Sequence, residues 1–429
     1  MNQISDQQIE EVLSKALQDK DLISDQDTSI IFYDLSFLDL RIQDLKKQFP
    51  ENALHAIAIK ANPLGTILQK IATSGIGLEA ATLPELYLAS HAGLPPERIV
   101  FDSPTKTNEE LDYALNLGVH INVDSLAELE RIEVLLHGRR PKGTIGVRIN
   151  PQVGIGTILS TSVTGSYSKF GVPLNEQRLE LRDAFIRCEW VSGVHLHIGS
   201  QGCSMELLLE GVARVLSFVH EVNNALSTRA NSRRINIVDL GGGLPVAYYR
   251  DEHATRMSQY KDSLFARFPE LFSGEFKLFT EFGRYIYANT GWVASRVEYV
   301  KRGDSRKTAM IHVGADMFLR ECYNPQDWHH EISVADHTGK HKVGLDDTKY
   351  FIAGPLCFAG DLIARDIELP PIDPGDYVII HDTGAYTLSM WSRYNSRQIP
   401  KVVGYYNDGS AFETLKQRED VESILRFWA

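Results

Sequence analysis

The feature that most constrains the fold is a regular alternation of short apolar runs with longer stretches of helical spacing. The stretches between the runs are long enough for helices, and several begin with Ser, Thr or Asn at a capping position. Eight runs separated by helices match the (β/α)8 barrel in number and size. The runs are residues 55–60, 77–82, 99–104, 120–125, 144–150, 193–199, 236–242 and 276–283. The sequence therefore predicts an α/β fold built on a TIM-like (β/α)8 barrel.

The character of the sequence changes near residue 290. From there, strand-like runs are separated by Gly, Pro, Asp and Asn, and helical spacing returns only at residues 410–427. This pattern predicts a second, mostly β domain of β-barrel-like form, to which the early run Ser29–Tyr33 can return. We expect the barrel to comprise residues 36–288 and the mostly β domain to comprise residues 1–35 plus 289–429.

Composition and charge exclude several classes of function. A chain of 429 residues with 43% hydrophobic content is long enough for two cores. The net charge of −12 is spread along the chain, which argues against nucleic acid or an anionic membrane as a partner. The polar segment 1–20 and the lack of a run of roughly 18 apolar residues predict a cytoplasmic protein. The four cysteines, Cys188, Cys203, Cys322 and Cys357, show no CxxC spacing and favour a reducing compartment.

Two histidines lie on the sixth run, Gly193–Gly199, where they alternate with apolar residues as a strand requires. His197 would lie at the carboxyl end of this strand, and in parallel barrels that end carries the chemistry. For His195 and for His197, a hydrogen-bonded core histidine is the alternative interpretation.

Lys60 ends the first strand-like run, Ala56–Lys60. An ammonium at the end of an apolar strand is costly to desolvate, so its pKa is expected to fall. A lowered pKa is what a lysine needs in order to act as a nucleophile or to form a Schiff base. The alternative is an ion pair with Glu79 on the following strand, which is compatible with such a function.

Glycines follow the last two strands of the predicted barrel. Gly241–Gly243 come after the seventh run, and Gly283 with Arg284 comes after the eighth. The loops after strands seven and eight of such barrels commonly hold a phosphate, because glycines let backbone N–H groups approach an anion. Arg284 would add a fixed pair of donors for the same phosphate.

These residues together fit one cofactor, pyridoxal 5'-phosphate, and no metal is needed to explain them. This phosphorylated aldehyde requires a lysine for the imine, a phosphate cup, a planar group against its ring and an acid near its ring nitrogen. The candidates in that order are Lys60, Gly241–Gly243 with Arg284, His197 and Glu281. A carboxylate at Glu281 would keep the ring nitrogen protonated and so favour decarboxylation.

The chain resembles, over nearly its whole length, the pyridoxal-phosphate decarboxylases of the alanine racemase-like fold, the group that contains diaminopimelate decarboxylase and ornithine decarboxylase. The matching motifs occur in the family's order. They are Ala58-Ile59-Lys60-Ala61-Asn62, Val123-Asp124-Ser125-Leu126, Arg148-Ile149-Asn150-Pro151, Ser168-Lys169-Phe170-Gly171, His197-Ile198-Gly199-Ser200-Gln201, Leu240-Gly241-Gly242-Gly243, Glu281-Phe282-Gly283-Arg284, Gly354-Pro355-Leu356-Cys357 and Gly384-Ala385-Tyr386.

The resemblance implies roles for individual residues. Lys60 would be the Schiff-base lysine, His197 would stack on the cofactor ring, and Cys357 would donate a proton to Cα in the active site of a partner subunit. Asp361 would also cross the interface of this homodimer. The further residues implied to contact the cofactor are Glu79, Arg148, Ser200, Gly241, Gly242, Gly243, Glu281, Gly283, Arg284 and Tyr386.

Departures from the family pattern bear on the substrate. Phe358 stands where diaminopimelate decarboxylases carry a glutamate that holds the distal amino group, and the family's Arg-Pro-Ala-Leu-Tyr motif is changed to Arg320-Glu321-Cys322-Tyr323-Asn324. We expect Arg320, Phe358, Asp361 and Tyr386 to contact the substrate. Arg320 and the segment Trp391–Arg397 favour a distal group that is anionic, or polar and compatible with aromatic side chains.

Three functions are open at this point. The favoured one is α-decarboxylation of an amino acid or amino-acid conjugate in specialised metabolism, such as the citryl-amino-acid intermediates of carboxylate siderophores. The second is diaminopimelate decarboxylation in lysine biosynthesis. The third is a non-catalytic pyridoxal-phosphate carrier, which is disfavoured because such carriers lack the second β domain in which Cys357 and Tyr386 lie.

Overall fold

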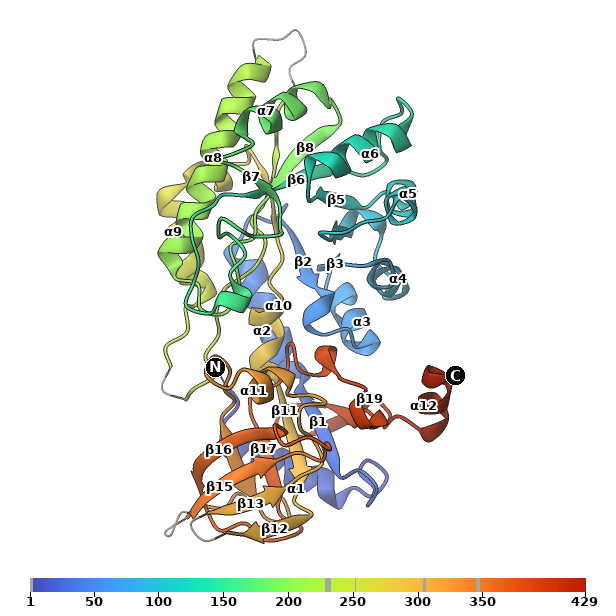
Figure 1. The fold of residues 1–429 in the computed structure, drawn as a ribbon, viewed down its shortest axis with the longest axis vertical. Helices are drawn as coiled ribbons and strands as arrows, with labels where there is room; N and C mark the ends of the chain where they lie inside the picture. Colours follow the sequence, from blue (N-terminus) through green and yellow to red (C-terminus); the bar gives the residue numbers. More distant parts are fainter. Residues whose placement is uncertain (1–2, 228–232, 251, 304–305, 345–347) are drawn as a thin grey trace. The chain divides into compact units, whose positions relative to one another are not determined.

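The computed structural model describes residues 3–227, 233–250, 252–303, 306–344 and 348–429 (Figure 1). The chain divides into two compact units. The barrel unit comprises residues 42–246 and 254–285, and the β unit comprises residues 1–41, 247–253 and 286–429. Among the described residues, no helix is both long and apolar enough to cross a bilayer.

Eight parallel strands of the described residues close into a barrel, because β5 pairs with β6 as well as with β4. In the order of the barrel the strands are β5 (His120–Val123), β4 (Ile99–Asp102), β3 (Gly77–Ala80), β2 (Leu54–Ala58), β10 (Lys277–Thr280), β9 (Ile237–Asp239), β8 (Val191–His195) and β6 (Ile145–Asn150). A short strand, β7 (Val172–Pro173), pairs with β6 outside the closed ring. The predicted (β/α)8 barrel is therefore confirmed.

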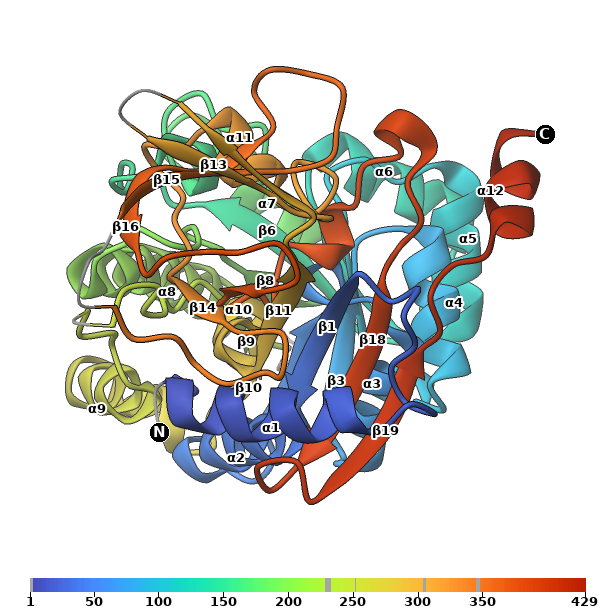
Figure 2. The same cartoon turned by 90° about the horizontal axis from the view of Figure 1, so that it is seen from below.

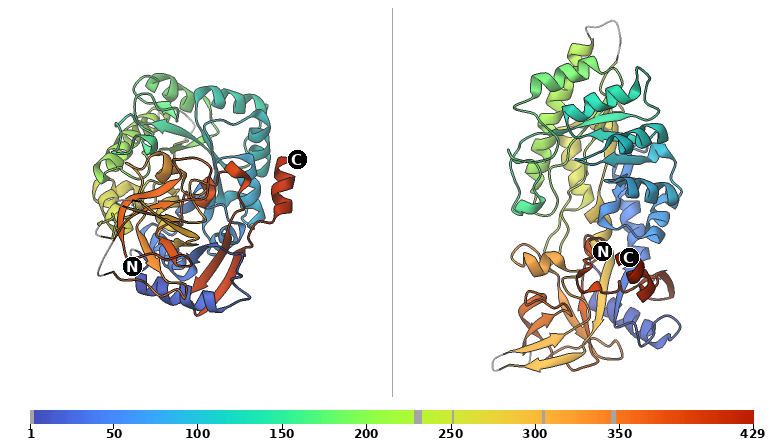
Figure 3. Two further views of the ribbon diagram at one scale, coloured as in Figure 1. Left: turned by 60° about the horizontal axis from the view of Figure 1, so that its bottom comes forward. Right: turned by 45° about the vertical axis from the view of Figure 1, so that its right-hand side comes forward.

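Helices separate the barrel strands and cover their outer surface, which explains why most strands are buried on both faces. Figure 3 shows α3 to α6 following one another around the outside of the strands. Side-chain caps fix three of the starts: Thr82, Thr107 and Ser125 accept hydrogen bonds from the third residue of α4, α5 and α6. The helices between the barrel strands are α3 (Gly65–Thr73), α4 (Leu83–His91), α5 (Asn108–Leu117), α6 (Leu126–Leu136), α7 (Arg178–Arg187), α8 (Met205–Ser227) and α9 (Met257–Arg267); α2 (Leu35–Gln48) precedes β2, and α10 (Gly283–Tyr287) follows β10.

The β unit contains two sheets, so the prediction of a mostly β second domain is confirmed. The six-stranded sheet has the order β14 (Ile332–Ala335), β17 (Tyr377–Ile380), β11 (Gly291–Arg296), β1 (Ser29–Asp34), β18 (Lys401–Tyr406), β19 (Ala411–Lys416). The four-stranded sheet has the order β12 (Tyr299–Arg302), β13 (Lys307–Met310), β15 (Thr348–Ala353), β16 (Leu362–Leu369). The helices here are α1 (Asp6–Gln18), α11 (Leu319–Tyr323) and α12 (Val421–Trp428).

The amino-terminal segment belongs to the core of the β unit. Strand β1 pairs antiparallel with β11 and parallel with β18, and Phe32 of β1 stacks on Trp292 at a centroid distance of 4.2 Å. Figure 2 shows α1 lying beside this sheet, and Ile9, Val12 and Leu13 of α1 pack into the same apolar cluster. The early strand thus returns to the late sheet.

Three local expectations were wrong. The helical spacing at 410–427 contains strand β19 first, because residues 411–416 pair with β18, and a helix forms only over Val421–Trp428. Strand β8 ends at His195, so His197 lies in the loop beyond it. Strand β2 ends at Ala58, so Lys60 lies in the 3-10 turn Ile59–Ala61.

Candidate functional site

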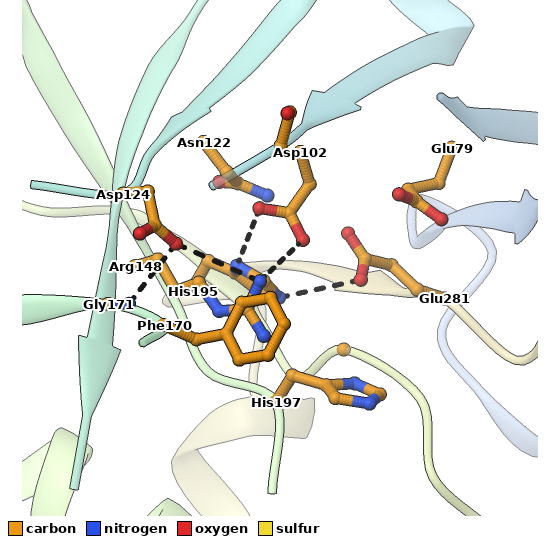
Figure 4. Close-up of polar contacts among 12 residues, drawn as sticks. Glu79, Asp102, Asn122, Asp124, Arg148, Phe170, Gly171, His195, His197 and Glu281 are labelled. Carbon is orange, nitrogen blue, oxygen red and sulfur yellow. Dashed lines mark hydrogen bonds and ion pairs between the residues drawn. The ribbon is translucent and has the colours of Figure 1, made fainter. Parts of the chain in front are cut away.

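Polar side chains gather at the carboxyl ends of the barrel strands, the end at which such barrels carry their chemistry. Figure 4 shows the side chains of several strands pointing toward one another there. Apart from Lys60, each of these residues is buried. They are Lys60 after β2, Glu79 on β3, Asp102 at the end of β4, Arg148 on β6, His195 at the end of β8, Asp239 at the end of β9 and Glu281 after β10.

Lys60 forms an ion pair with Glu79, as one interpretation of the sequence proposed, and its Nζ donates a hydrogen bond to Glu79 Oε2. The Lys60 side chain is 43% exposed, so it is not buried as the sequence led us to expect. Glu79 is fully buried, and this burial raises its pKa to about 7 against the opposing effect of Lys60. The pair therefore places a reachable amine beside a carboxyl that titrates near neutral pH.

Opposite this pair, Arg148 lies between two carboxyls. Its Nη1 is 3.1 Å from Asp102 Oδ2 and 3.9 Å from Asp124 Oδ1, and its guanidinium lies over the ring of Phe170. Burial acts to raise the pKa of Asp102, but Arg148 and His195 outweigh it and hold that pKa well below its ordinary value. Asp102 is therefore ionised, and the Asp102–Arg148 pair is a fixed buried charge pair.

His195 connects that pair to Glu281. Its Nδ1 is 3.7 Å from Asp102 Oδ1, and its Nε2 is 3.4 Å from Glu281 Oε2. Burial lowers the pKa of His195. Burial, followed by the nearby carboxyls of Glu79 and Asp102, raises the pKa of Glu281 well above its ordinary value.

The carboxyls at this end of the barrel outnumber the cations. Within the described part of the chain, they form ion pairs with Lys60, Arg148 and His195 only. Burial raises the pKa of Asp239 to about 8 and that of Asp124 to about 6. Since the interior cannot hold so many uncompensated charges, several of these carboxyls carry protons at neutral pH. The carboxyls are Glu79, Asp102, Asp124, Asp239 and Glu281.

The glycine loop after β9 packs too closely for any side chain. A Cβ on Gly242 would lie 2.4 Å from the carbonyl oxygen of Glu281, and Gly243 has a φ of +104° that favours glycine. The N–H of Gly242 donates to Nδ1 of His197 at 3.2 Å, so this nitrogen is unprotonated. Burial, with Arg148 and Lys60, lowers the pKa of His197 well below its ordinary value, which makes its ring neutral.

Arg284 and Ser200 meet beside this glycine loop. Nε of Arg284 donates to Oγ of Ser200 at 3.0 Å, which joins the loop after β8 to the turn after β10. Gly283 begins α10 directly before Arg284. Within the barrel unit, the glycine loop, Ser200 and Arg284 therefore lie together although they come from different strands, whereas Tyr386, the other predicted phosphate contact, belongs to the β unit.

The donor set fits pyridoxal phosphate. Buried Oε1 of Glu281 has no hydrogen-bond partner in the described part of the chain, and so it can accept from a ring nitrogen. The exposed amine of Lys60, the neutral ring of His197 and the glycine loop supply the remaining requirements of the cofactor.

The predicted site residues outside the barrel belong to the β unit. The Arg320 guanidinium lies over the rings of Trp328 and Tyr386, at 4.4 Å and 5.0 Å from their centroids. Asp361 is buried, and its carboxylate accepts hydrogen bonds from the backbone N–H groups of Ala315 and Leu356 at 2.6 Å each. Within its own unit, Asp361 therefore fixes the backbone that precedes Cys357.

Cys357 is exposed at the edge of an aromatic cluster, which we define as Tyr323, Phe358 and Tyr394. The Phe358 ring is stacked on Tyr323 at 5.5 Å and meets Tyr394 edge-on at 6.3 Å. The backbone of Cys357 is held from both sides, because its N–H donates to Asn395 Oδ1 and its carbonyl accepts from the Tyr394 hydroxyl. The thiol is thus presented on a fixed backbone.

Sequence reasoning missed Asp102 and Asp239 and left His195 undecided. A usable signal was present, because Asp102 and Asp239 lie near the carboxyl ends of strand-like runs, as Glu281 does. A polar residue at such a position in a parallel barrel faces the site. The local motifs contain the residues that would contact the cofactor. They do not contain Asp102, His195 or Asp239.

Comparisons with known proteins agree with this geometry. Residues 36–288 match the family model described as the pyridoxal-binding domain of pyridoxal-dependent decarboxylases. The diaminopimelate decarboxylase of Methanothermobacter thermautotrophicus is 32% identical over 376 residues, which are 86% of this chain and 83% of that protein. The diaminopimelate decarboxylase of Helicobacter pylori is 30% identical over 416 residues, which are 95% of this chain and 97% of that protein.

Solved structures show the same likeness. The crystal structure of the Helicobacter pylori diaminopimelate decarboxylase complexed with L-lysine superposes with a TM-score of 0.82 at 27% identity, covering 95% of this chain and 98% of that one. The lysine/ornithine decarboxylase of Vibrio vulnificus complexed with putrescine has a TM-score of 0.72 at 21% identity, covering 89% of this chain and 94% of that one. The second likeness concerns the fold alone.

Proposed function

The chain belongs to the pyridoxal-dependent decarboxylase family and is a pyridoxal-phosphate-dependent carboxy-lyase, and from this premise we propose that it removes a carboxyl group from diaminopimelate to form lysine. The observation that carries the proposal is similarity along almost the full length of both chains to relatives named for that reaction. A solved relative named diaminopimelate decarboxylase is complexed with L-lysine, the expected product.

The barrel residues have distinct tasks in this reaction. When bound, pyridoxal phosphate withdraws electrons from the substrate Cα and so lets the carboxyl group leave as CO2. Lys60 would hold the aldehyde carbon of the cofactor, and Glu79 can accept a proton from Lys60 Nζ because its pKa is about 7. Glu281 would hold the ring nitrogen, and its Oε1 is available for that bond.

The remaining contacts position the cofactor. Gly241–Gly243, Ser200 and Arg284 would bind its phosphate through backbone N–H groups, a hydroxyl and a guanidinium. The ring of His197 is neutral and fixed by the Gly242 N–H, so it can lie flat against the cofactor without adding charge. The Arg284–Ser200 and Gly242–His197 hydrogen bonds hold these groups in place, which reduces the entropy cost of binding.

The β unit supplies the groups proposed for the substrate and for the proton return. Cys357 would donate its Sγ proton to Cα after CO2 leaves, in a homodimer in which it serves the partner's active site, and Tyr386 would join the phosphate contacts. Arg320 would pair with the distal carboxylate of diaminopimelate. The cytoplasmic location expected from the sequence stays a prediction.

The relatives favour diaminopimelate over the siderophore intermediates that the sequence departures suggested. The third expectation, a non-catalytic carrier, is excluded because the chain is a carboxy-lyase.

One observation nevertheless favours a second candidate function, α-decarboxylation of an amino acid whose distal end is not a bare ammonium. Phe358 packs in the aromatic cluster and offers no carboxylate to an ammonium group.

A substrate panel decides between the two. Purified protein with pyridoxal phosphate is incubated with diaminopimelate, lysine, ornithine and a citryl-amino acid, and both CO2 and the amine product are measured. Lysine formed from diaminopimelate supports the proposal. CO2 released only from the conjugate, with none from diaminopimelate, sinks it in favour of the second function.

Position 358 sharpens the result. Phe358→Glu should lower the KM for diaminopimelate if Phe358 contacts the distal amino group, whereas Phe358→Leu, which restores no charge, should not.

A further inference from the structure

The strongest unexplained feature of the barrel is His195. It is fully buried at the end of β8, and its ring lies between Asp102 and Glu281 (Figure 4). Neither ring nitrogen has a hydrogen-bond partner in the described part of the chain, although both are polar and inaccessible to water. A buried imidazole with two unsatisfied nitrogens is costly, so this position needs a reason beyond packing.

The two nitrogens face different carboxyls. Nδ1 is directed at Asp102 Oδ1 at 3.7 Å, and Nε2 at Glu281 Oε2 at 3.4 Å. The Glu281 gap is roughly 0.4–0.5 Å longer than an ordinary hydrogen bond, and the Asp102 gap is roughly 0.7–0.8 Å longer. The ring can therefore bridge the two carboxyls through opposite nitrogens, with only small movements.

The charged groups around the bridge favour one arrangement of protons on Asp102, His195 and Glu281. Asp102 is ionised because Arg148 pairs with it, while burial disfavours charge on both His195 and Glu281. The pattern that satisfies all three groups has Nδ1–H of His195 donating to Asp102, and the Glu281 carboxyl proton donating to Nε2. The other charged or titratable groups that act on His195 are Glu79, His120, Arg148, His197 and Asp239. Glu281 also interacts with Lys60 and Glu79, and its carboxyl is hydrogen-bonded to the Asp239 side chain.

We propose that His195 is a positioning residue for Glu281: its imidazole bridges the Glu281 carboxyl to the Asp102–Arg148 ion pair, and so fixes both the orientation of that carboxyl and the proton it carries. The inference rests on the proposed place of Glu281 at the cofactor ring nitrogen. It does not depend on the identity of the substrate.

The bridge has a consequence for cofactor binding. If Glu281 gave up its proton when the cofactor is bound, its carboxylate would face His195, and Nε2 of His195 could then turn from acceptor to donor, because an imidazole between two carboxylates readily takes up a proton. The bridge is thus suited to hold Glu281 in either protonation state. At the far end of the bridge, the Arg148 guanidinium lies over the ring of Phe170, 4.5 Å from its centroid.

The test combines infrared spectroscopy with cofactor affinity on the full-length protein. The difference spectrum between cofactor-free and cofactor-loaded protein should contain the carbonyl band of a protonated carboxylic acid, and Glu281→Gln should remove this band. His195→Phe should shift the band and weaken cofactor binding by on the order of ten- to a hundredfold, the scale on which loss of a buried hydrogen bond acts. His195→Gln keeps one hydrogen bond to Glu281 but loses the contact with Asp102, so it should shift the band and weaken cofactor binding by about two- to tenfold.

The matched control is His55→Gln. His55 is also a buried histidine on a barrel strand, but Nδ1 is hydrogen-bonded to the neutral hydroxyl of Thr280 at 2.8 Å, so its replacement should change neither readout. Thermal melting identifies variants that fail to fold, and His195→Gln remains informative where His195→Phe does not.

Three results would overturn the inference. The first is a carbonyl band and an affinity that are the same in folded His195→Phe as in the wild type, since His195 would then only fill the core. The second is folded His195→Gln with the band and affinity of His55→Gln. The third is a band that survives Glu281→Gln. Because neither readout uses a substrate, failure to decarboxylate diaminopimelate would leave this test unaffected.

Discussion

The carboxyl end of the barrel holds its functional side chains in a buried network of charges, whereas the β unit leaves Cys357 exposed and holds its backbone by hydrogen bonds. In the barrel, neighbouring groups set each protonation state, so replacing one group changes the others. In the aromatic cluster around Cys357, the interactions are between rings and backbone, and a replacement changes shape or polarity locally. Under the proposed assignments, replacements in the barrel site should therefore affect the cofactor chemistry, and replacements in the aromatic cluster should affect substrate choice.

This contrast has a thermodynamic basis. Removing one partner of a buried ion pair leaves an uncompensated charge and costs about 3–5 kcal/mol. A substitution on an exposed surface usually changes stability by less than about 0.5 kcal/mol. Variants of the barrel site should therefore damage turnover of every substrate, while variants near Cys357 should change the preference among substrates.

The largest expected effect is that of Lys60→Ala. Because the amine that would hold the cofactor is removed, turnover of every substrate should fall by at least about 10³-fold. Borohydride reduction followed by mass spectrometry should no longer attach the cofactor to this position. A variant that keeps the reducible adduct would show that another amine carries the cofactor.

Glu281→Gln should have the next largest effect. The cofactor should bind more weakly but still occupy the site at saturating concentration through its phosphate contacts, and turnover should fall by about 10²- to 10³-fold, the scale on which a single electrostatic interaction acts in a dry site. Steady-state kinetics with the best substrate of the panel provide the measurement. Full turnover would mean that the ring nitrogen is held by a different residue. The buried charges of the barrel would then not control the cofactor chemistry as proposed.

Arg320→Ala tests the proposal that residues of the β unit control substrate preference. If Arg320 pairs with a distal carboxylate, the variant should raise KM for diaminopimelate by roughly ten- to a hundredfold and leave kcat nearly unchanged. Arg320→Lys is the matched control, because it keeps the positive charge but loses the planar fork that lies over Trp328. An equal loss for substrates without a distal carboxylate would contradict the assignment.

The smallest expected effect is on the pH dependence of stability. Glu79 and Asp239 have pKa values of about 7 and about 8 in the folded protein, above their ordinary values. For a carboxyl with a raised pKa, the folded state binds the proton more tightly, so the stabilising contribution is present below its ordinary pKa and is lost as pH rises through the raised value.

Denaturant unfolding of the cofactor-free protein should therefore give a free energy of unfolding that falls between about pH 4 and pH 8 through these two groups. Glu79→Gln should flatten the part of this fall that lies below about pH 7. The same slope in the variant and the wild type would show that Glu79 does not carry a proton in the folded state.

The sequence was sufficient to predict those candidate site residues that lie in short local motifs. Lys60, His197, Gly241–Gly243 and Arg284 each lie at or just after the end of a strand, and the geometry of a parallel barrel brings the ends of its strands together whatever the loops do. The two-unit architecture followed from the change of pattern near residue 290. The boundaries of individual helices and strands were predicted less accurately. Strand β8 ends before His197, and β19 takes the place of the start of a predicted helix.

Other features had no local signature. The role of Asp361 depends on backbone N–H groups of residues 315 and 356, and the protonation of Glu281 depends on Glu79, Asp102 and His195 from three other strands. A short motif shows which side chains follow a strand. The sequence by itself therefore determined the barrel and the residues that fit the cofactor. Only the tertiary structure decided which carboxyls are charged, because a pKa depends on burial and on distances between groups far apart in the chain.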